Sequence, residues 1–345
     1  MKKIAYIEVD THAEIARNFL ELMKGSSEFA VDYYFSEKIL KQIGKHQTNI
    51  FVTESSMLLN QLKNENYDLI IIGTVHRYFN VLGIIAREYN TAIIVHNLKF
   101  TGISSFHLFR NILKKDFAYR LKLMLKESLL SASKVYQKGK NLLVLDENLS
   151  SKKLIFLPVF FNEFIENMPS AVFTVVIPGA VSQRRRDYVS VLKKITHFRN
   201  NFKIVFLGKA TGKELKWLTT FEKNKPENIS IEYFTEKVPQ HIFDEWMQRS
   251  NVLWCPVQKK TEFFSNPEIY GKTKMSGNLG DAIKYGKMAI FPKDYDLTRY
   301  PFLVNENEEV EKQLLDLSKM EFNFQETFSR KKIAADLHTV LNSLV

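Results

Sequence analysis

The chain has 345 residues and one cysteine, Cys255, so two domains are expected, while an internal disulfide and a Cys-rich zinc site are excluded. Hydrophobic residues make up 45% and charged residues 25% of the sequence, as in soluble globular proteins. The opening MKKIAYIEVD lacks the apolar run of a signal peptide, and no stretch approaches the roughly 18 apolar residues of a membrane span. We therefore expect a cytoplasmic protein.

The net charge of +11 is concentrated in one segment, from Arg110 to Lys140. Helical spacing over residues 106–130 places apolar side chains on one arc with lysines beside it, a pattern typical of a helix at a membrane surface. The alternative is a core-packed helix with a solvated basic face. We expect this segment to contact an anionic membrane surface, and we expect no nucleic-acid partner because no nucleic-acid-binding module is recognisable.

The first half alternates apolar runs typical of strands with helical patterns. Strands are expected over residues 3–9, 29–34, 50–52, 69–72, 92–95, 142–145 and 154–157. This alternation predicts a doubly wound parallel sheet whose ligand crevice lies at the carboxyl ends of the strands. Asp10, His12, His76 and His96 all fall at that edge. Asp10 and His12 either act on substrate or cap the following helix.

The second half repeats the alternation, with strands expected over residues 172–177, 203–207, 229–233, 252–256 and 288–291. The polar, Pro-bearing region 162–170 is the expected domain boundary. Three loops that follow strands combine small residues with fixed positive charge: Gly179 with Arg184–Arg186, Gly208 with Lys209, and Lys274 with Ser276 and Gly277. We expect Arg184 to Arg186 to open a helix, and the third loop to lead into a helix that ends at Gly286. Glycine backbones, lysine or arginine charge and a helix N-terminus together suit a diphosphate.

Other chemistries have little support in the sequence. Neither glycine loop has the spacing of a Walker motif or a dinucleotide fingerprint, and HExxH and paired cysteines are absent. The nearest acidic pair is Asp294 and Asp296 in KDYD, which we expect in an exposed loop. We therefore expect no cofactor and no metal. Ionisable groups in the first half and phosphate donors in the second suit the transfer of a group from a phosphate leaving group.

The sequence resembles the GT-B glycosyltransferases, and within them the bacterial family-4-like enzymes that use nucleotide sugars. The resemblance rests on IPGAVSQRRRDY, FLGKATG, YGKTKMSGNLGDAIKYGKMAIFP and the strand end IIVHN. It implies an α/β protein with two Rossmann-like doubly wound parallel-sheet domains that face a central cleft. The acceptor-side domain would span residues 1–165, the donor domain residues 171–322, and a helix over residues 323–345 would return to the first domain.

The resemblance also implies roles for individual residues. His96 would meet the transferred sugar, and Asp281 would approach the ribose. The remaining implied donor contacts are Gly179 and Arg185 for the diphosphate, Lys209, Lys274, Ser276 and Gly277 for further phosphate contacts, and Phe234 and Thr235 near the base.

Many members of this group carry two glutamates eight positions apart. Here Asp281 stands at the second position and Thr273 at the first, so Glu262 or Glu268 would have to supply a donor-sugar carboxylate. If the enzyme inverts the stereochemistry of the sugar, Asp10 or His12 would be the base that deprotonates the acceptor hydroxyl.

The function expected from the sequence is metal-independent transfer of a sugar from a nucleoside-diphosphate sugar to a glycan or lipid-linked saccharide in surface polysaccharide biosynthesis. The protein would be peripheral on the inner face of the cell membrane. The alternative is a catalytically silent GT-B subunit that binds and supports a partner glycosyltransferase.

Overall fold

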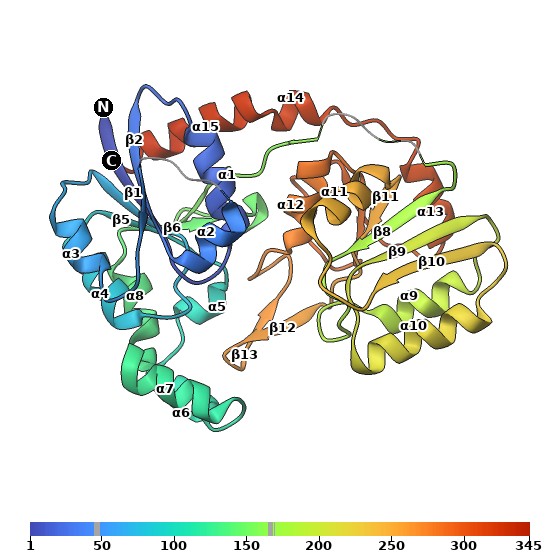
Figure 1. Ribbon diagram of the computed structural model, residues 1–345, viewed down its shortest axis with the longest axis horizontal. Coiled ribbons are helices and arrows are strands. Elements are labelled where there is room, and N and C mark those ends of the chain that lie inside the picture. Colours follow the sequence, from blue (N-terminus) through green and yellow to red (C-terminus); the bar gives the residue numbers. More distant parts are fainter. Residues whose placement is uncertain (45–48, 165–167, 169) are drawn as a thin grey trace. The chain divides into compact units, whose positions relative to one another are not determined.

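The computed structural model describes residues 1–44, 49–164, 168 and 170–345, and the chain forms two compact units (Figure 1). The first unit comprises Met1–Phe160, Glu262–Glu268 and Arg330–Val345, and the second comprises Phe161–Thr261 and Ile269–Ser329. Part of the expected domain boundary, residues 165–167 and 169, lies outside the described residues. The expected continuous donor domain is interrupted, because Glu262–Glu268 belongs to the first unit.

The first unit is built on a parallel sheet with the strand order β3-β2-β1-β4-β5-β6-β7. The strands are β1 (Lys2–Glu8), β2 (Phe29–Phe35), β3 (Ile50–Val52), β4 (Leu69–Ile72), β5 (Thr91–Ile94), β6 (Asn141–Val144) and β7 (Leu154–Phe156). Every residue of β4 and β5 is buried, as expected for central parallel strands rich in Ile. The doubly wound sheet predicted for the first half is therefore confirmed.

Helices cover both faces of this sheet (Figure 1). They are α1 (Ala13–Met23), α2 (Glu37–Ile43), α3 (Leu58–Lys63), α4 (Phe79–Glu88), α5 (Leu98–Thr101), α6 (Ser105–Ile112), α7 (Phe117–Glu127), α8 (Ala132–Lys138) and α15 (Arg330–Asn342), with 3-10 turns η1 (Leu129–Ser131) and η2 (Glu147–Leu149). Helix α1 packs against α2 and α15 on one face, and α4 packs against α3 and α8 on the other. The two chain termini are adjacent, because Lys2 Nζ donates to Asn342 Oδ1 at 3.0 Å.

The second unit has a parallel sheet with the order β10-β9-β8-β11-β14-β15. Its strands are β8 (Thr174–Pro178), β9 (Phe202–Lys209), β10 (Ile229–Phe234), β11 (Val252–Trp254), β14 (Ala289–Phe291) and β15 (Leu303–Asn305). Its helices are α9 (Tyr188–Ile195), α10 (Gly212–Asn224), α11 (Gln240–Arg249), α12 (Gly277–Tyr285), α13 (Val310–Leu317) and α14 (Phe324–Phe328). Helices α9 and α10 lie on one side of the sheet and α11 and α12 on the other (Figure 1).

Three details differ from the sequence prediction. The expected helix over residues 106–130 is two helices, α6 and α7, interrupted at Asp116, whose φ of 52° is left-handed. Arg184 to Arg186 precede α9 instead of opening it, because Asp187 is the N-cap and accepts the backbone N–H of Ser190. A hairpin of β12 (Lys260–Phe263) and β13 (Asn266–Ile269), which the sequence analysis did not predict, precedes α12.

Candidate functional site

The strongest candidate for an anion site in the second unit surrounds the turn after β8. Gly179 has a φ of 102°, a conformation that L side chains rarely adopt, and a Cβ there would lie 2.4 Å from Arg186 Nη2. The bare backbone therefore lets the Arg186 guanidinium lie against the turn. Arg185, the residue predicted from the sequence, is exposed, whereas Arg186 is half-buried. We correct the prediction: Arg186 is the arginine at the Gly179 turn.

Arg186 is joined to the start of α12 through Asn278. Arg186 Nη2 donates to Asn278 Oδ1 at 3.0 Å, and Asn278 Nδ2 donates to Asp281 Oδ2 at 2.9 Å and to the Pro178 carbonyl at 3.2 Å. The buried Nε of Arg186 has no hydrogen-bond partner among the residues that the structure describes. A guanidinium with an unused N–H beside a carboxylate offers donors to a phosphate and an acceptor to a sugar hydroxyl.

The N-terminus of α12 opens beside this network. Ser276 is its N-cap, and its side chain accepts the N–H of Asn278 at 3.3 Å. Gly277 is exposed, and a Cβ there would meet no heavy atom within 4 Å. The positive end of the helix dipole is thus accessible at Gly277. Lys274, half-buried, lies three residues before the first helical residue.

The predicted phosphate and base contacts lie at the neighbouring strand ends. Lys209 is paired with Phe234 across β9 and β10, and the side chain of Phe234 is half-buried whereas Thr235 is exposed. Lys209 Nζ lies 3.2 Å from Glu236, an exposed ion pair that a phosphate would have to displace. The role of Gly208 is packing, because a Cβ there would lie 2.3 Å from the Gly179 carbonyl oxygen. The absence of a side chain at Gly208 therefore lets the turns after β8 and β9 lie in contact.

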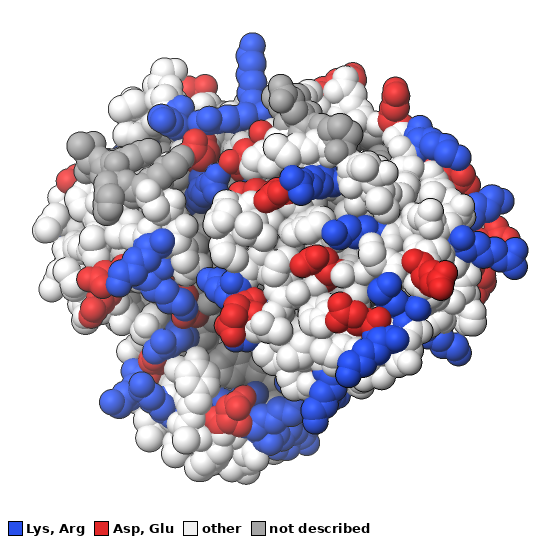
Figure 2. Space-filling view, turned by 45° about the vertical axis from the view of Figure 1, so that its right-hand side comes forward, with Lys and Arg blue, Asp and Glu red and all other residues white. Residues whose placement is uncertain are grey.

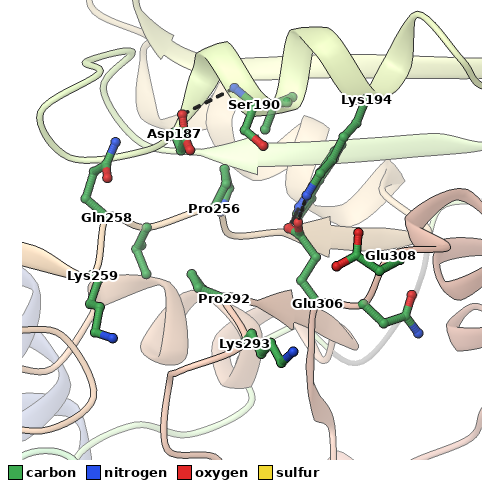
Figure 3. A pocket seen from close by; sticks show the side chains of 14 residues that line it. Asp187, Ser190, Lys194, Pro256, Gln258, Lys259, Pro292, Lys293, Glu306 and Glu308 are labelled. Carbon is green, nitrogen blue, oxygen red and sulfur yellow. Dashed lines mark hydrogen bonds and ion pairs between the residues drawn. The ribbon is translucent and has the colours of Figure 1, made fainter.

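A separate cavity of about 310 Å³ lies between α9 and the ends of β11, β14 and β15 (Figure 3). Its lining carries both signs of charge. Lys194 and Glu306 point toward one another and form an ion pair, and Trp254 Nε1 donates to Glu306 at 2.7 Å. Lys259 on the lining pairs with Asp294, which lies outside it, at 2.6 Å. These mutual pairings make the cavity less suitable for a diphosphate than the Gly179 turn with Arg186.

In the first unit, three histidines from different strand ends form a cluster. The rings of His12 and His96 are stacked with centroids 3.8 Å apart and planes 6° apart, and the His76 ring lies 5.7 Å from each. His12 is the N-cap residue of α1 with a φ of 62°, but its side chain accepts no hydrogen bond from the helix N–H groups, so it does not cap the helix with its ring. The expectation that parallel strands bring His12, His76 and His96 to one edge is confirmed.

The hydrogen bonds of the cluster define its tautomers. His96 Nε2 lies 2.8 Å from the Gly73 carbonyl oxygen, which can only accept, so Nε2 carries a proton. His76 Nε2 lies 3.3 Å from Asn97 Nδ2, which can only donate, so this His76 nitrogen is the acceptor. In the neutral rings, Nδ1 of His96 is then a hydrogen-bond acceptor and Nδ1 of His76 a donor.

Glu8, which the sequence analysis did not select, holds the loop that leads to His12. Its Oε1 accepts the backbone N–H groups of Asp10 and Thr11, each at 3.2 Å, and its Oε2 accepts the Thr74 hydroxyl at 2.6 Å. Burial raises the pKa of Glu8 to about 8. Asp10 itself lies 3.8 Å from Lys38 Nζ in a partly exposed ion pair.

The two glutamates considered as replacement donor-sugar carboxylates both belong to the first unit. Glu268 is 0% exposed, and its carboxylate accepts the backbone N–H of Lys99 at 3.4 Å and of Phe100 at 3.1 Å. Glu262 forms an ion pair with Lys115. Burial and two backbone N–H contacts give Glu268 a structural part in the first unit, and its donor-sugar role stays a prediction.

Helices α6 and α7 expose an unusual number of large apolar side chains. All six lie in or just before the basic segment, and the exposed fraction of each side chain is high: Phe106 (73%), Phe109 (49%), Leu113 (65%), Phe117 (52%), Tyr119 (48%) and Leu125 (73%). We call these six residues the α6–α7 patch. Figure 2 shows lysine and arginine side chains around the lower projection of the molecule, where Figure 1 places α6 and α7. Leu108, Ile112 and Leu123 instead point into the core, so each helix has one buried and one exposed apolar face.

In the described part of the chain, two kinds of feature are absent. No group of three or more His, Cys, Asp or Glu side chains is placed there to hold a metal ion. Within the same residues, no helix combines the length and the apolar composition that crossing a bilayer requires.

Comparison with known proteins identifies the architecture. Neither the protein-family models nor the curated proteins gave a match to this sequence. Among solved structures, the sucrose-phosphate synthase of Thermosynechococcus elongatus matches with a TM-score of 0.60 at 11% identity, covering 100% of this chain and 99% of that chain. The lipopolysaccharide outer core galactosyltransferase WaaB matches with a TM-score of 0.57, and HepE of Anabaena, solved with UDP and glucose, with a TM-score of 0.53. Both are 11% identical, and each match covers 99% of this chain and 100% of the other.

At this level of identity the similarity establishes the fold. The protein has the GT-B fold of these glycosyltransferases, with two Rossmann-like units built on parallel sheets. The fold prediction made from the sequence is therefore confirmed.

Proposed function

We propose that the protein is a glycosyltransferase that moves a sugar from a nucleoside-diphosphate sugar to a glycan or lipid-linked acceptor. The observation that carries this proposal is the Arg186 guanidinium between the Gly179 turn and the Asn278–Asp281 pair. It places a fixed cation, an accessible helix N-terminus and a carboxylate in one unit of a GT-B fold. HepE, a protein of this fold, was solved with UDP and glucose, which supports a nucleotide-sugar donor.

The donor would bind to the second unit through its diphosphate and ribose. Arg186 and the N–H groups at the start of α12 would hold the diphosphate and stabilise the negative charge that develops as the sugar leaves. Asp281 would accept a ribose hydroxyl, and Phe234 and Thr235 would lie near the base. Arg186 and Asp281 are positioned before the donor arrives, because Asn278 joins them by hydrogen bonds. We expect this step to need no metal ion.

The first unit would supply the acceptor side of the reaction. His12 or Asp10 would take the proton from the acceptor hydroxyl as it attacks the anomeric carbon, and His96 would contact the transferred sugar. Stacking of His12 on His96 keeps the two rings in van der Waals contact at the ends of β1 and β5. A base at His12 corresponds to the inverting alternative considered from the sequence.

The α6–α7 patch would hold the protein on an anionic membrane. Aromatic and Leu side chains would enter the interface while Lys114, Lys115, Lys122 and Lys126, all exposed, would lie near the headgroups. This surface fits an acceptor carried on a lipid, as in surface polysaccharide biosynthesis at the inner face of the cell membrane. WaaB, a lipopolysaccharide galactosyltransferase, shares the fold.

Turnover of donors tests the proposal directly. Purified protein is mixed with UDP-glucose, GDP-mannose or ADP-glucose and a bacterial lipid-linked saccharide extract, and release of the free nucleoside diphosphate is measured with and without EDTA. We expect release from one donor class that EDTA does not reduce. Donor binding without release from any donor would instead favour a catalytically silent subunit that supports a partner enzyme.

A further inference from the structure

The β12–β13 hairpin connects residues of the second unit but packs in the first. The chain leaves the second unit after Thr261 and returns to it at Ile269, and the intervening Glu262–Glu268 belongs to the first unit. Only six residues separate Glu268 from Met275, which precedes the N-cap of α12. Contacts with the first unit must hold this segment in place, and the hairpin makes several of them.

The tip of the hairpin is held in a conformation that its sequence does not favour. Phe264 and Ser265 have φ values of 48° and 56°, the left-handed geometry of a tight hairpin turn that normally selects Gly or Asn. Such a conformation costs about 1 kcal/mol or more for each residue. It is retained here because Arg120 donates to Ser265 Oγ at 2.9 Å and Asn111 donates to the Phe264 carbonyl at 3.1 Å. The turn is therefore set by α6 and α7 of the first unit.

The stem of the hairpin caps the helix that follows His96. Helix α5 starts after Asn97, the residue type that most often caps a helix with its own side chain, yet Asn97 makes no cap hydrogen bond. The buried carboxylate of Glu268 takes that place by accepting the N–H groups of Lys99 and Phe100. The Asn97 amide is directed instead to His76 Nε2 at 3.3 Å.

Phe263 contacts the histidine cluster directly. Its ring lies 4.4 Å from the His76 ring at 42° and meets Phe100 edge-on at 4.8 Å. His76 is thus in contact with Phe263, while its ring lies 5.7 Å from both His12 and His96. The neighbouring Phe264 stacks on Phe100, meets the Phe263 ring edge-on at 4.8 Å and lies under Arg120. Two adjacent phenylalanines therefore have different surroundings.

From these contacts we infer that Phe263 and Glu268 are positioning residues for the histidine cluster. Phe263 sets the orientation of the His76 ring, and Glu268 fixes the start of α5 so that Asn97 binds His76 instead of capping the helix. Only the expected effect of these residues on catalysis rests on the proposed function. The positioning itself is a property of the first unit and does not depend on any substrate.

Histidine NMR separates the positioning from the activity. Protein labelled with carbon-13 at histidine Cε1 is titrated between pH 5 and 8, with the His76 signal assigned from the His76→Gln variant. We expect Phe263→Leu to move the His76 chemical shift and its titration midpoint, whereas Phe264→Leu in the same hairpin, which meets the Phe263 ring, should move both much less. A Phe263→Leu spectrum that matches wild type at His76 would overturn the inference.

Glu268 is tested by a conservative and a disruptive variant. Glu268→Gln keeps one carbonyl acceptor for the α5 N–H groups and should retain most of the His76 shift, while Glu268→Ala should move it as Phe263→Leu does. Equal spectra for the two Glu268 variants would contradict the capping role. If Glu268→Ala does not fold, the comparison of Phe263→Leu with Phe264→Leu still tests whether the hairpin positions His76.

Activity provides the second readout. Once a donor is known, Phe263→Leu should lower kcat at least about tenfold and shift its pH profile, with donor affinity within twofold of wild type. A shifted His76 signal in a protein that turns over no donor would leave the positioning intact and reject the proposed function. An unchanged kcat with a shifted His76 signal would reject the catalytic consequence.

Discussion

Arg186 Nη2 donates a 3.0 Å hydrogen bond to Asn278 Oδ1, which connects the turn after β8 to the first turn of α12. The bond leaves the buried Nε of Arg186 without a partner in the described part of the chain. An unused buried N–H on a cation costs free energy unless a ligand or water satisfies it. A phosphate that reached this N–H would recover that free energy, which is one basis of the proposed donor site.

Gly179 is expected to be intolerant of any side chain. Gly179→Ala combines an unfavourable φ of 102° with a Cβ placed 2.4 Å from Arg186 Nη2, so the guanidinium must move. Urea unfolding should show a loss of more than about 1 kcal/mol from the backbone alone, and donor affinity should fall at least about tenfold.

Gly212 provides the matched control. Its φ is 58°, but a Cβ there would meet no atom within 4 Å. Gly212→Ala should therefore cost only about 1 kcal/mol of stability and leave donor affinity unchanged. If both variants lose donor affinity equally, the contact between Gly179 and Arg186 is not part of the site.

His12 can be replaced without disturbing its backbone. Asn tolerates the left-handed conformation of this position, so His12→Asn should fold while removing the imidazole. If His12 is the base, kcat should fall about 100-fold or more. His241→Asn, an exposed histidine on α11, is the control, and an equal kcat for the two variants would remove His12 from the mechanism.

Glu8 predicts a specific dependence of stability on pH. Its folded-state pKa of about 8 lies above its ordinary value of 4.5. Below pH 4.5 the carboxyl is protonated in both states, and as the pH rises toward 8 only the unfolded state loses the proton, so this contribution to stability is progressively lost.

The comparison that isolates this effect is wild type against Glu8→Gln. Between pH 4.5 and 8, the free energy of unfolding of wild type, measured in urea, should fall relative to that of Glu8→Gln by on the order of a few kcal/mol. Above pH 8 the difference should become constant. A difference that stays constant or moves in favour of wild type over this range would show that Glu8 does not retain its proton in the folded protein.

The α6–α7 patch predicts binding to anionic vesicles. Replacing Phe106 and Phe109 by Ser removes two aromatic rings from the bilayer interface and should weaken sedimentation with phosphatidylglycerol-containing vesicles by at least about tenfold. Met320→Ser, also exposed but in the second unit, should have no effect. Binding should weaken with salt. Equal binding to purely zwitterionic vesicles would contradict a role for the lysines.

Much of the fold could be predicted from the sequence because its signals are local. The apolar run Leu69–Ile72 and the terminal Gly286 each indicate their structure within a few residues. The β12–β13 hairpin has no such signal, because Phe264 and Ser265 adopt a left-handed turn only through tertiary contacts with Arg120 and Asn111. The break between α6 and α7 at Asp116 is likewise unmarked by Gly or Pro.

The candidate site was predicted in outline but not in every residue. Strand ends identified His12, His96, Gly179 and the start of α12, since parallel strands bring their carboxyl ends to one edge. The choice between Arg185 and Arg186 depends on where α9 begins, and the N-cap Asp187 was the signal that could have decided it. Glu8 and Asn278 act through buried hydrogen bonds between distant segments, which no local pattern reveals.

The central claim is that Arg186 binds the diphosphate of a nucleotide donor. Calorimetric titration with UDP, GDP and ADP, with and without EDTA, is made on wild type, Arg186→Gln and the exposed neighbour Arg185→Gln. We predict saturable binding of one nucleotide that EDTA does not affect, an affinity at least about tenfold lower for Arg186→Gln, and an affinity within twofold of wild type for Arg185→Gln. Binding that survives Arg186→Gln unchanged, or no binding of any nucleotide to wild type, would contradict the claim.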